Sequence, residues 1–211
     1  MDDFITSEVT DISPEFVIDR LTTLNKLLGS GKYIVVTNLM GILRYLPNTK
    51  LYKNKIIDIN KDMDIDRDDF INKLFDLGYE KKPVVSRTGE MAIRGYVIDI
   101  FPIEFDNPIR IEFWGDTIDS IKYFDLEDQI SNTSIDSVKI YPYTEFLIDG
   151  KIGDNIIRKQ KYLLNYSDSV SGLWDYVSDS VIFYYDYNQI INSYSLLRDN
   201  ILEYDSELDD D

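Results

Sequence analysis

The sequence has 211 residues, 44% of them hydrophobic and 13% aromatic, which is enough apolar material for a folded protein of one or two domains. Lys and Arg number 22 against 39 Asp and Glu, giving a formal net charge of -17 that repels nucleic-acid phosphates unless the cations gather on one face. Because Cys and His are absent, disulfides, thiolate or imidazole metal sites, and catalysis by thiol or imidazole groups are excluded. We expect no cofactor and no metal site.

The two ends of the sequence are polar and acidic in pattern. The first residues, Met1-Asp2-Asp3-Phe4, lack the basic and then apolar pattern of a secretory signal, and no stretch is long and apolar enough to span a bilayer. The acidic run at 204–211 is typical of a solvated chain end. We therefore expect a cytoplasmic protein with no membrane partner.

Residues 13–60 alternate between helical and strand-like patterns. A Ser-Pro pair indicates a helix start and Gly29 indicates its end, with leucines between them at helical spacing. The apolar runs at 33–36 and 56–59 indicate buried strands, separated by a short helix. This order of elements predicts a parallel sheet.

The pattern changes in the middle of the chain. A helix is predicted over 66–77, and after it the period becomes two, with strand-like runs at 84–87, 91–101, 109–114, 118–125 and 137–141. Such short intervals predict hairpins and therefore an antiparallel sheet. Beyond residue 147 the alternation resumes, with helical patterns near 155–164, 173–177 and 188–203 and an apolar run at 181–185.

We interpret the chain as an α/β protein whose parallel-sheet body is interrupted by an inserted α+β module with an antiparallel sheet. The body comprises residues 1–60 and 141–211, and the module comprises residues 61–140.

Two apparent ligand motifs fail on their spacing. Gly29-Ser30-Gly31-Lys32 resembles a phosphate-binding loop, but a helix precedes it, a strand is expected after it, and Tyr33 stands where Ser or Thr would bind magnesium. The alternating acids at 62–68 resemble a calcium loop, but Arg67 replaces the required Gly and Lys73 replaces the bidentate Glu. We interpret the first as a helix end and turn, and the second as a charged linker. No carboxylate pair stands out as catalytic.

Residues 109–114 alternate between two chemically different faces. One face is apolar and we expect it to be buried, while the other carries Arg110, Glu112 and Trp114. Arginine beside an exposed tryptophan is common in protein–protein hot spots. The same pattern also fits a solvated face on which Arg110 neighbours Glu112, so the pattern alone leaves both interpretations open.

A series of short motifs runs through the module: Leu77-Gly78-Tyr79, Gly89-Glu90, Ile93-Arg94-Gly95, Val97-Ile98-Asp99-Ile100-Phe101-Pro102, Ile109-Arg110-Ile111-Glu112-Phe113-Trp114 and Asp119-Ser120-Ile121-Lys122-Tyr123-Phe124-Asp125. In order and spacing it resembles the module shared by the bacterial transcription-repair coupling factors (Mfd) and the excision-repair protein UvrB. The flanks, including Tyr141-Pro142-Tyr143-Thr144-Glu145-Phe146 and Leu173-Trp174-Asp175-Tyr176-Val177, resemble the N-terminal UvrB-homology region of the coupling factors. UvrB itself carries a phosphate-binding loop that this sequence lacks.

The resemblance implies a degenerate RecA-like body that begins before residue 1, and a module that binds the damage-recognition protein UvrA. It implies a non-catalytic adaptor that recruits nucleotide excision repair to stalled RNA polymerase. ATP-driven DNA translocation and RNA polymerase binding would belong to other parts of the parent protein, whose C-terminal domain would mask the UvrA surface. We expect no strong DNA binding; the alternative is a nucleotide-binding, UvrB-like helicase fragment that acts directly on DNA.

The resemblance assigns three residues to UvrA contact. They are Arg94 in the Arg-Gly motif, Arg110 at the start of the 109–114 strand, and Trp114 at its end, where relatives more often have Phe. Period two places Arg94 on the same strand face as Tyr96. The neighbouring Gly95 has no side chain and leaves room for a bulge or a close partner.

Overall fold

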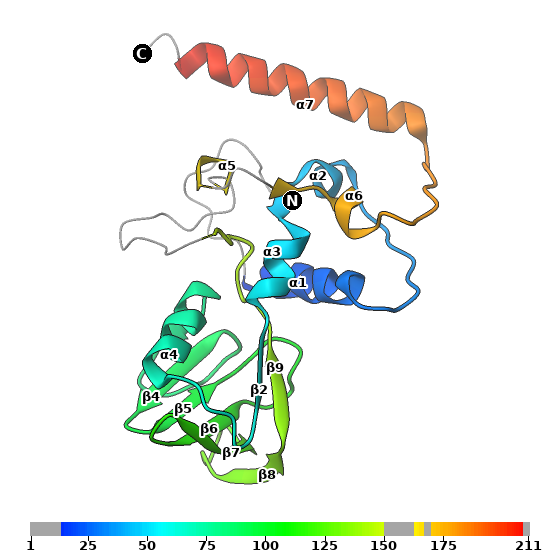
Figure 1. The fold of residues 1–211 in the computed structure, drawn as a ribbon. Helices are drawn as coiled ribbons and strands as arrows, with labels where there is room; N and C mark the ends of the chain where they lie inside the picture. Colours follow the sequence, from blue (N-terminus) through cyan, green and yellow to red (C-terminus); the bar gives the residue numbers. More distant parts are fainter. Residues whose placement is uncertain (1–13, 150–162, 167–169, 209–211) are drawn as a thin grey trace.

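The computed structural model describes residues 14–149, 163–166 and 170–208 (Figure 1). The Ser expected to cap the first helix, most of the helix expected at 155–164, and the last residues of the acidic tail lie outside the described residues. A sheet module lies at the bottom of Figure 1, a group of helices lies above it, and the last helix lies farthest from the sheet.

The amino-terminal helices form where local signals predict them. Helix α1 (Pro14–Leu28) ends at a turn over 29–30, and α2 (Leu39–Leu43) and α3 (Thr49–Lys55) follow. The asparagines before α2 and α3 accept hydrogen bonds from backbone N–H groups and so cap both helices. Between these helices β1 (Leu46–Pro47) pairs antiparallel with β10 (Val170–Ser171).

The sheet module is framed by β2 (Ile57–Asn60) and β9 (Ser137–Ile140), which pair antiparallel. Helix α4 (Arg67–Asp76) follows β2 and precedes a six-stranded sheet. In spatial order the sheet contains β3 (Glu80–Lys81), β4 (Glu90–Arg94), β5 (Val97–Ile100), β6 (Ile109–Trp114), β7 (Thr117–Phe124) and β8 (Ser131–Ile135). The β3–β4 pair is parallel, and the other four pairs are antiparallel.

Helix α4 and the β2–β9 pair bury one face of the six-stranded sheet. Asp66 caps α4 by accepting a hydrogen bond from the Asp69 N–H at 2.7 Å, which is the capped helix expected after the charged linker. The core beneath the helix contains Ile59, Phe70, Leu74, Leu77, Met91, Ile98, Ile100, Ile109, Ile111, Phe113, Ile118, Ile121, Val138 and Ile140, among others. Each large apolar side chain buried there contributes about 1.5–3 kcal/mol, so this cluster is the main source of the module's stability.

Among the described residues of the carboxy-terminal part there are three further helices: α5 (Leu163–Tyr166), α6 (Leu173–Tyr176) and α7 (Tyr187–Leu208). Helix α6 matches the expected turn of helix, and α7 extends to Leu208, beyond the end expected at 203. No helix in the described part of the chain is both long and apolar enough to cross a bilayer.

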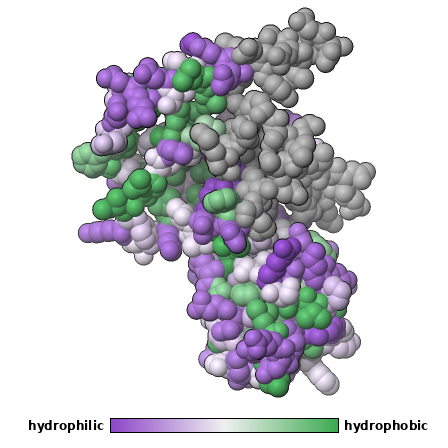
Figure 2. Space-filling model, turned by 180° about the vertical axis from the view of Figure 1, so that it is seen from behind, coloured by the Kyte–Doolittle hydropathy of each residue, from purple (hydrophilic) through white to green (hydrophobic). Residues whose placement is uncertain are grey.

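The apolar runs at 33–36 and 181–185 are not strands, contrary to our expectation. Both are irregular backbone, and Ile34 and Phe183 are 95% and 90% exposed. Both segments run along the right of the upper part in Figure 1. Figure 2 views the molecule from behind, and it shows hydrophobic side chains at the surface on the corresponding upper left side. A strand requires a neighbour for its backbone hydrogen bonds, and no described strand pairs with either run.

The described residues therefore form a mixed α/β structure dominated by an antiparallel sheet, and a parallel-sheet body is not shown. The expected strand at 56–59 does form as β2, but it is antiparallel to β9. The Gly29-Ser30-Gly31-Lys32 segment is a turn followed by irregular backbone, as the interpretation of a helix end requires.

The run at 91–101 is a hairpin instead of one strand. Gly95 and Tyr96 form a turn between β4 and β5, and Gly95 has a φ of +57°, a conformation that glycine adopts without strain. The expected strand at 84–87 is irregular backbone, and β8 forms where no strand was expected.

Candidate partner-binding site

The alternation predicted for β6 is confirmed. Its apolar residues face α4, with Ile109 and Ile111 fully buried and Phe113 5% exposed. Arg110, Glu112 and Trp114 lie on the opposite face of the sheet. We call the surface formed by Arg94, Asp99, Arg110, Glu112 and Lys122 the polar face.

Asp99 is the centre of the polar face. It lies on β5 opposite Arg110 of β6, and its side chain is 1% exposed. Arg110 binds it with two hydrogen bonds, Nε to Oδ1 at 2.7 Å and Nη2 to Oδ2 at 3.0 Å, and Arg94 of β4 donates to the same Oδ2. A buried carboxylate is stable only when such donors satisfy it, so Asp99 joins the two arginines into one cluster.

Arg110 is held more tightly than Arg94. Its Nη1 donates to the backbone oxygen of Gln129 at 3.1 Å and to Ser131 Oγ at 3.3 Å, and its guanidinium lies 4.7 Å from the ring centroid of Phe124. The hydrogen bonds to Asp99 raise the pKa of Arg110. The Arg110 side chain is 15% exposed and that of Arg94 is 46% exposed, so Arg94 presents the more accessible cation.

A second ion pair extends the polar face onto β7. Glu112 accepts hydrogen bonds from Lys122 Nζ at 2.6 Å and from Ser120 Oγ, and these two donors lower the pKa of Glu112. The polar face thus holds three cations and two carboxylates, which leaves one net positive charge. In a chain with a net charge of -17, such a surface is locally suited to a partner's carboxylate.

Trp114 lies at the end of β6 and is 82% exposed. The structure thus places all three sequence-predicted residues on one side of the sheet, with the arginines joined through Asp99 and the tryptophan at the strand end. Sequence reasoning missed Asp99. The sequence feature that could have identified it is an acidic residue within the apolar strand at 97–100, since a carboxylate buried at that position needs cationic neighbours.

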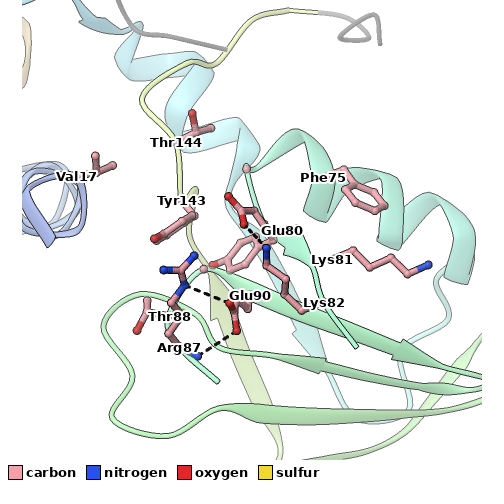
Figure 3. Close-up of a pocket in the computed structure, with 13 residues that line it drawn as sticks. Val17, Phe75, Glu80, Lys81, Lys82, Arg87, Thr88, Glu90, Tyr143 and Thr144 are labelled. Atoms are coloured by element: carbon pink, nitrogen blue, oxygen red, sulfur yellow. Dashed lines mark hydrogen bonds and ion pairs between the residues drawn. The ribbon is translucent and has the colours of Figure 1, made fainter. Parts of the chain in front are cut away.

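A separate cavity of about 670 Å³ lies between α1 and the sheet module (Figure 3). Arg87 and Lys82 line it, and each pairs with an acid: Arg87 Nε with Glu90 at 3.2 Å and Lys82 Nζ with Glu80 at 3.0 Å (Figure 3). These pairs partly neutralise the cavity's cations. Among the described residues, no group of three or more acids is placed to hold a metal ion.

Comparison with known proteins identifies the module. Residues 57–146 match the UvrB interaction domain family. The transcription-repair-coupling factor of Staphylococcus aureus (strain bovine RF122 / ET3-1) is 36% identical over 150 residues, which is 71% of this chain and 13% of the relative. The transcription-repair-coupling factor of Staphylococcus haemolyticus (strain JCSC1435) is 37% identical over 146 residues, which is 69% of this chain and 12% of the relative. That of Bacillus subtilis (strain 168) is 36% identical over 148 residues, which is 70% of this chain and 13% of the relative.

The antiparallel sheet, its framing strands and the polar face thus belong to a UvrB interaction domain. The similarity to the coupling factors extends over more residues than this domain alone. The chain belongs to the transcription-repair-coupling factor family, in which it corresponds to the amino-terminal region, and it spans about 13% of the length of the curated relatives it matches.

Proposed function

We propose that this chain is a non-catalytic adaptor that binds UvrA through the polar face and Trp114, and thereby recruits nucleotide excision repair to stalled RNA polymerase. The observation that carries the proposal is an exposed tryptophan on the same side of the sheet as an arginine cluster with one net positive charge, within a domain that matches the UvrB interaction domain family. The roles of Arg94, Arg110 and Trp114 are part of this proposal.

The chemistry of the polar face supports contact with a carboxylate. Arg94 is bound to Asp99 on one side and exposed on the other, so its remaining N–H groups can donate to a partner without breaking the cluster. Trp114 can bury a large apolar area at a small cost in conformational entropy. Arg110, which is mostly buried, would contribute mainly by holding Asp99 and Arg94 in place.

The remaining assignments concern the parent protein and its domains. We propose that residues 61–140 are the UvrA-binding module and that residues 1–60 and 141–211 belong to a RecA-like body. The exposed apolar runs at 33–36 and 181–185 support this division, because such surfaces normally pack against further structure. RNA polymerase binding, ATP-driven DNA translocation and masking by a C-terminal domain are proposed for the rest of the relatives' length, and the location is proposed to be cytoplasmic.

Calorimetry with purified UvrA tests the proposal. We expect the wild-type chain to bind, and Trp114→Ala to weaken binding about 10-fold or more, equivalent to about 1.4 kcal/mol or more. Trp174→Ala is the matched control, because Trp174 is 41% exposed on α6, away from the polar face, and should bind as the wild type does. No binding of UvrA by the wild-type chain would refute the function, and equal binding by both tryptophan variants would refute the site.

A further inference from the structure

Two hairpin turns lie side by side at one end of the six-stranded sheet. The β4–β5 turn contains Gly95 and Tyr96, and the β6–β7 turn contains Gly115 and Asp116. Each glycine is the first central residue of its turn, with φ of +57° and +63°, which is the glycine position of type II′ hairpins. We call the surface formed by residues 94–97 and 114–117 the hairpin edge.

Hydrogen bonds from β6 and from residues 65 and 67 hold the backbone of the hairpin edge in place. The Phe113 N–H donates to the Tyr96 carbonyl at 2.8 Å, which joins the first turn to β6. The start of α4 and the segment before it hold both turns: Arg67, the first residue of α4, donates from Nη2 to the Gly95 carbonyl at 2.5 Å, and the Ile65 N–H donates to the Asp116 carbonyl at 2.8 Å. These bonds fix the backbone of both turns, so little backbone ordering entropy is left to lose on binding.

Tyr96 is a large aromatic residue on this fixed edge, yet it is 65% exposed and belongs to none of the buried clusters. Its carbonyl accepts the hydrogen bond from Phe113, the residue that precedes Trp114 in β6, and it is two residues from Arg94 in the sequence. Tyrosine, tryptophan and arginine are the residues most enriched in binding hot spots. Here the three gather at one edge of an otherwise acidic chain.

We propose that Tyr96 is a further partner-contact residue, which together with Trp114 enters an apolar groove of UvrA while Arg94 pairs with a carboxylate at the groove's rim. This inference rests on the proposed function, because it names an additional contact for the same partner. It also divides the roles on the sheet. Arg94, Tyr96 and Trp114 contact the partner, whereas Asp99 and Arg110 position Arg94.

Calorimetry with purified UvrA tests Tyr96 separately from the function itself. We expect Tyr96→Ala to weaken binding about 10-fold, and Tyr96→Phe to stay within about 3-fold of the wild type because the ring supplies the contact. Tyr185→Ala, at a tyrosine that is 94% exposed far along the chain, should leave the affinity unchanged. Since Tyr96 and Trp114 would share one groove, their double variant should lose less than the product of the two single losses.

The outcomes separate the two proposals. If the wild-type chain binds UvrA and Trp114→Ala weakens binding but Tyr96→Ala does not, Tyr96 is no contact and the proposed function stands. If the wild-type chain does not bind, the proposed function fails first. Should Tyr96→Ala unfold the chain, hydrogen exchange on the wild type decides: slower exchange of the 95–97 amides in the presence of UvrA supports the contact, and unchanged exchange overturns it.

Discussion

At the scale of single residues, Asp99 explains why the two arginines of the candidate site are not equivalent. Its carboxylate is 1% exposed and accepts from both arginines, but Arg110 supplies two of the bonds and is also held by Gln129 and Ser131. Arg94 supplies the outer bond and remains half exposed. Loss of Arg110 therefore removes most of the compensation for a buried charge, whereas loss of Arg94 removes one accessible partner.

We predict that Arg110→Ala lowers the free energy of unfolding by about 3 kcal/mol, because breaking a buried ion pair leaves an uncompensated charge. Arg94→Ala should cost about 1 kcal/mol or less, as for exposed pairs. Urea unfolding of both variants measures the difference, with Arg198→Ala as a control at an arginine that is 58% exposed. Equal losses for Arg94→Ala and Arg110→Ala would show that Asp99 does not depend mainly on Arg110.

Glu90 gives the module a pH-dependent contribution to stability. Its side chain is 7% exposed and accepts from the Ser86 N–H at 2.8 Å, Ser86 Oγ at 2.9 Å and Arg87. Burial alone would raise the pKa of Glu90, but these hydrogen bonds outweigh burial and lower it below its ordinary value of 4.5. A carboxyl group with a lowered folded-state pKa stabilises the fold above that ordinary value, and the contribution is lost as the pH falls through the folded-state pKa.

We therefore predict that Glu90→Gln lowers the free energy of unfolding by about 1–3 kcal/mol at pH 7, because the loop donors lose a charged acceptor. The difference from the wild type should shrink as the pH falls below about 4. Urea unfolding at pH 7, 5 and 3 measures it. Glu80→Gln is the control, since Glu80 is 57% exposed and should show a small effect at every pH. A difference for Glu90→Gln that stays constant with pH would contradict the prediction.

At the scale of elements, the sequence predicts best where the signal is local. Helix α4 has a capping Asp66 and one apolar face, and both features act within the helix itself. Strand β6 alternates without interruption because one of its faces packs on α4 and the other does not. These two elements could be assigned without knowing what lies beside them.

Elements that depend on a neighbour were harder to predict. The β4–β5 turn interrupts the strand-like run at 91–101, and only the Gly95-Tyr96 pair marks the place where the chain reverses. Strand β8 is polar and mostly exposed at the sheet edge, so it has no alternation to detect and forms because β7 offers a pairing partner. The run at 33–36 shows the reverse case, since its composition favours a strand but no described strand pairs with it.

The candidate site also contains residues that a local sequence pattern identifies and residues whose role depends on a neighbouring strand. The alternation of β6 showed that Arg110 and Trp114 share a face, and the family resemblance singled out Arg94. The burial of Asp99 and the pairing of Tyr96 with Phe113, the neighbour of Trp114, depend on the register between strands, which the sequence does not state. For that reason sequence reasoning could name contact residues but could not separate the contacts from the residues that hold them in position.

At the scale of the whole molecule, two electrostatic effects oppose each other. The net charge of -17 makes the folded chain repel itself, and this repulsion is carried mainly by exposed carboxylates that salt screens. The ion pairs that stabilise the fold include buried ones, such as Asp99 with Arg110 and Glu145 with Arg44, whose side chains are 1–15% exposed. Salt screens buried pairs much less than exposed charges.

We therefore predict that the chain becomes more stable as NaCl rises from about 10 mM to about 100 mM, where the screening length falls from about 30 Å to about 10 Å. The gain in the free energy of unfolding should be on the order of 1 kcal/mol. Urea unfolding at each salt concentration measures it, and KCl should give the same result if screening, not specific ion binding, is the cause. A loss of stability with salt would show that attractive pairs outweigh the repulsion, and the net charge would then not be the dominant electrostatic feature of this fold.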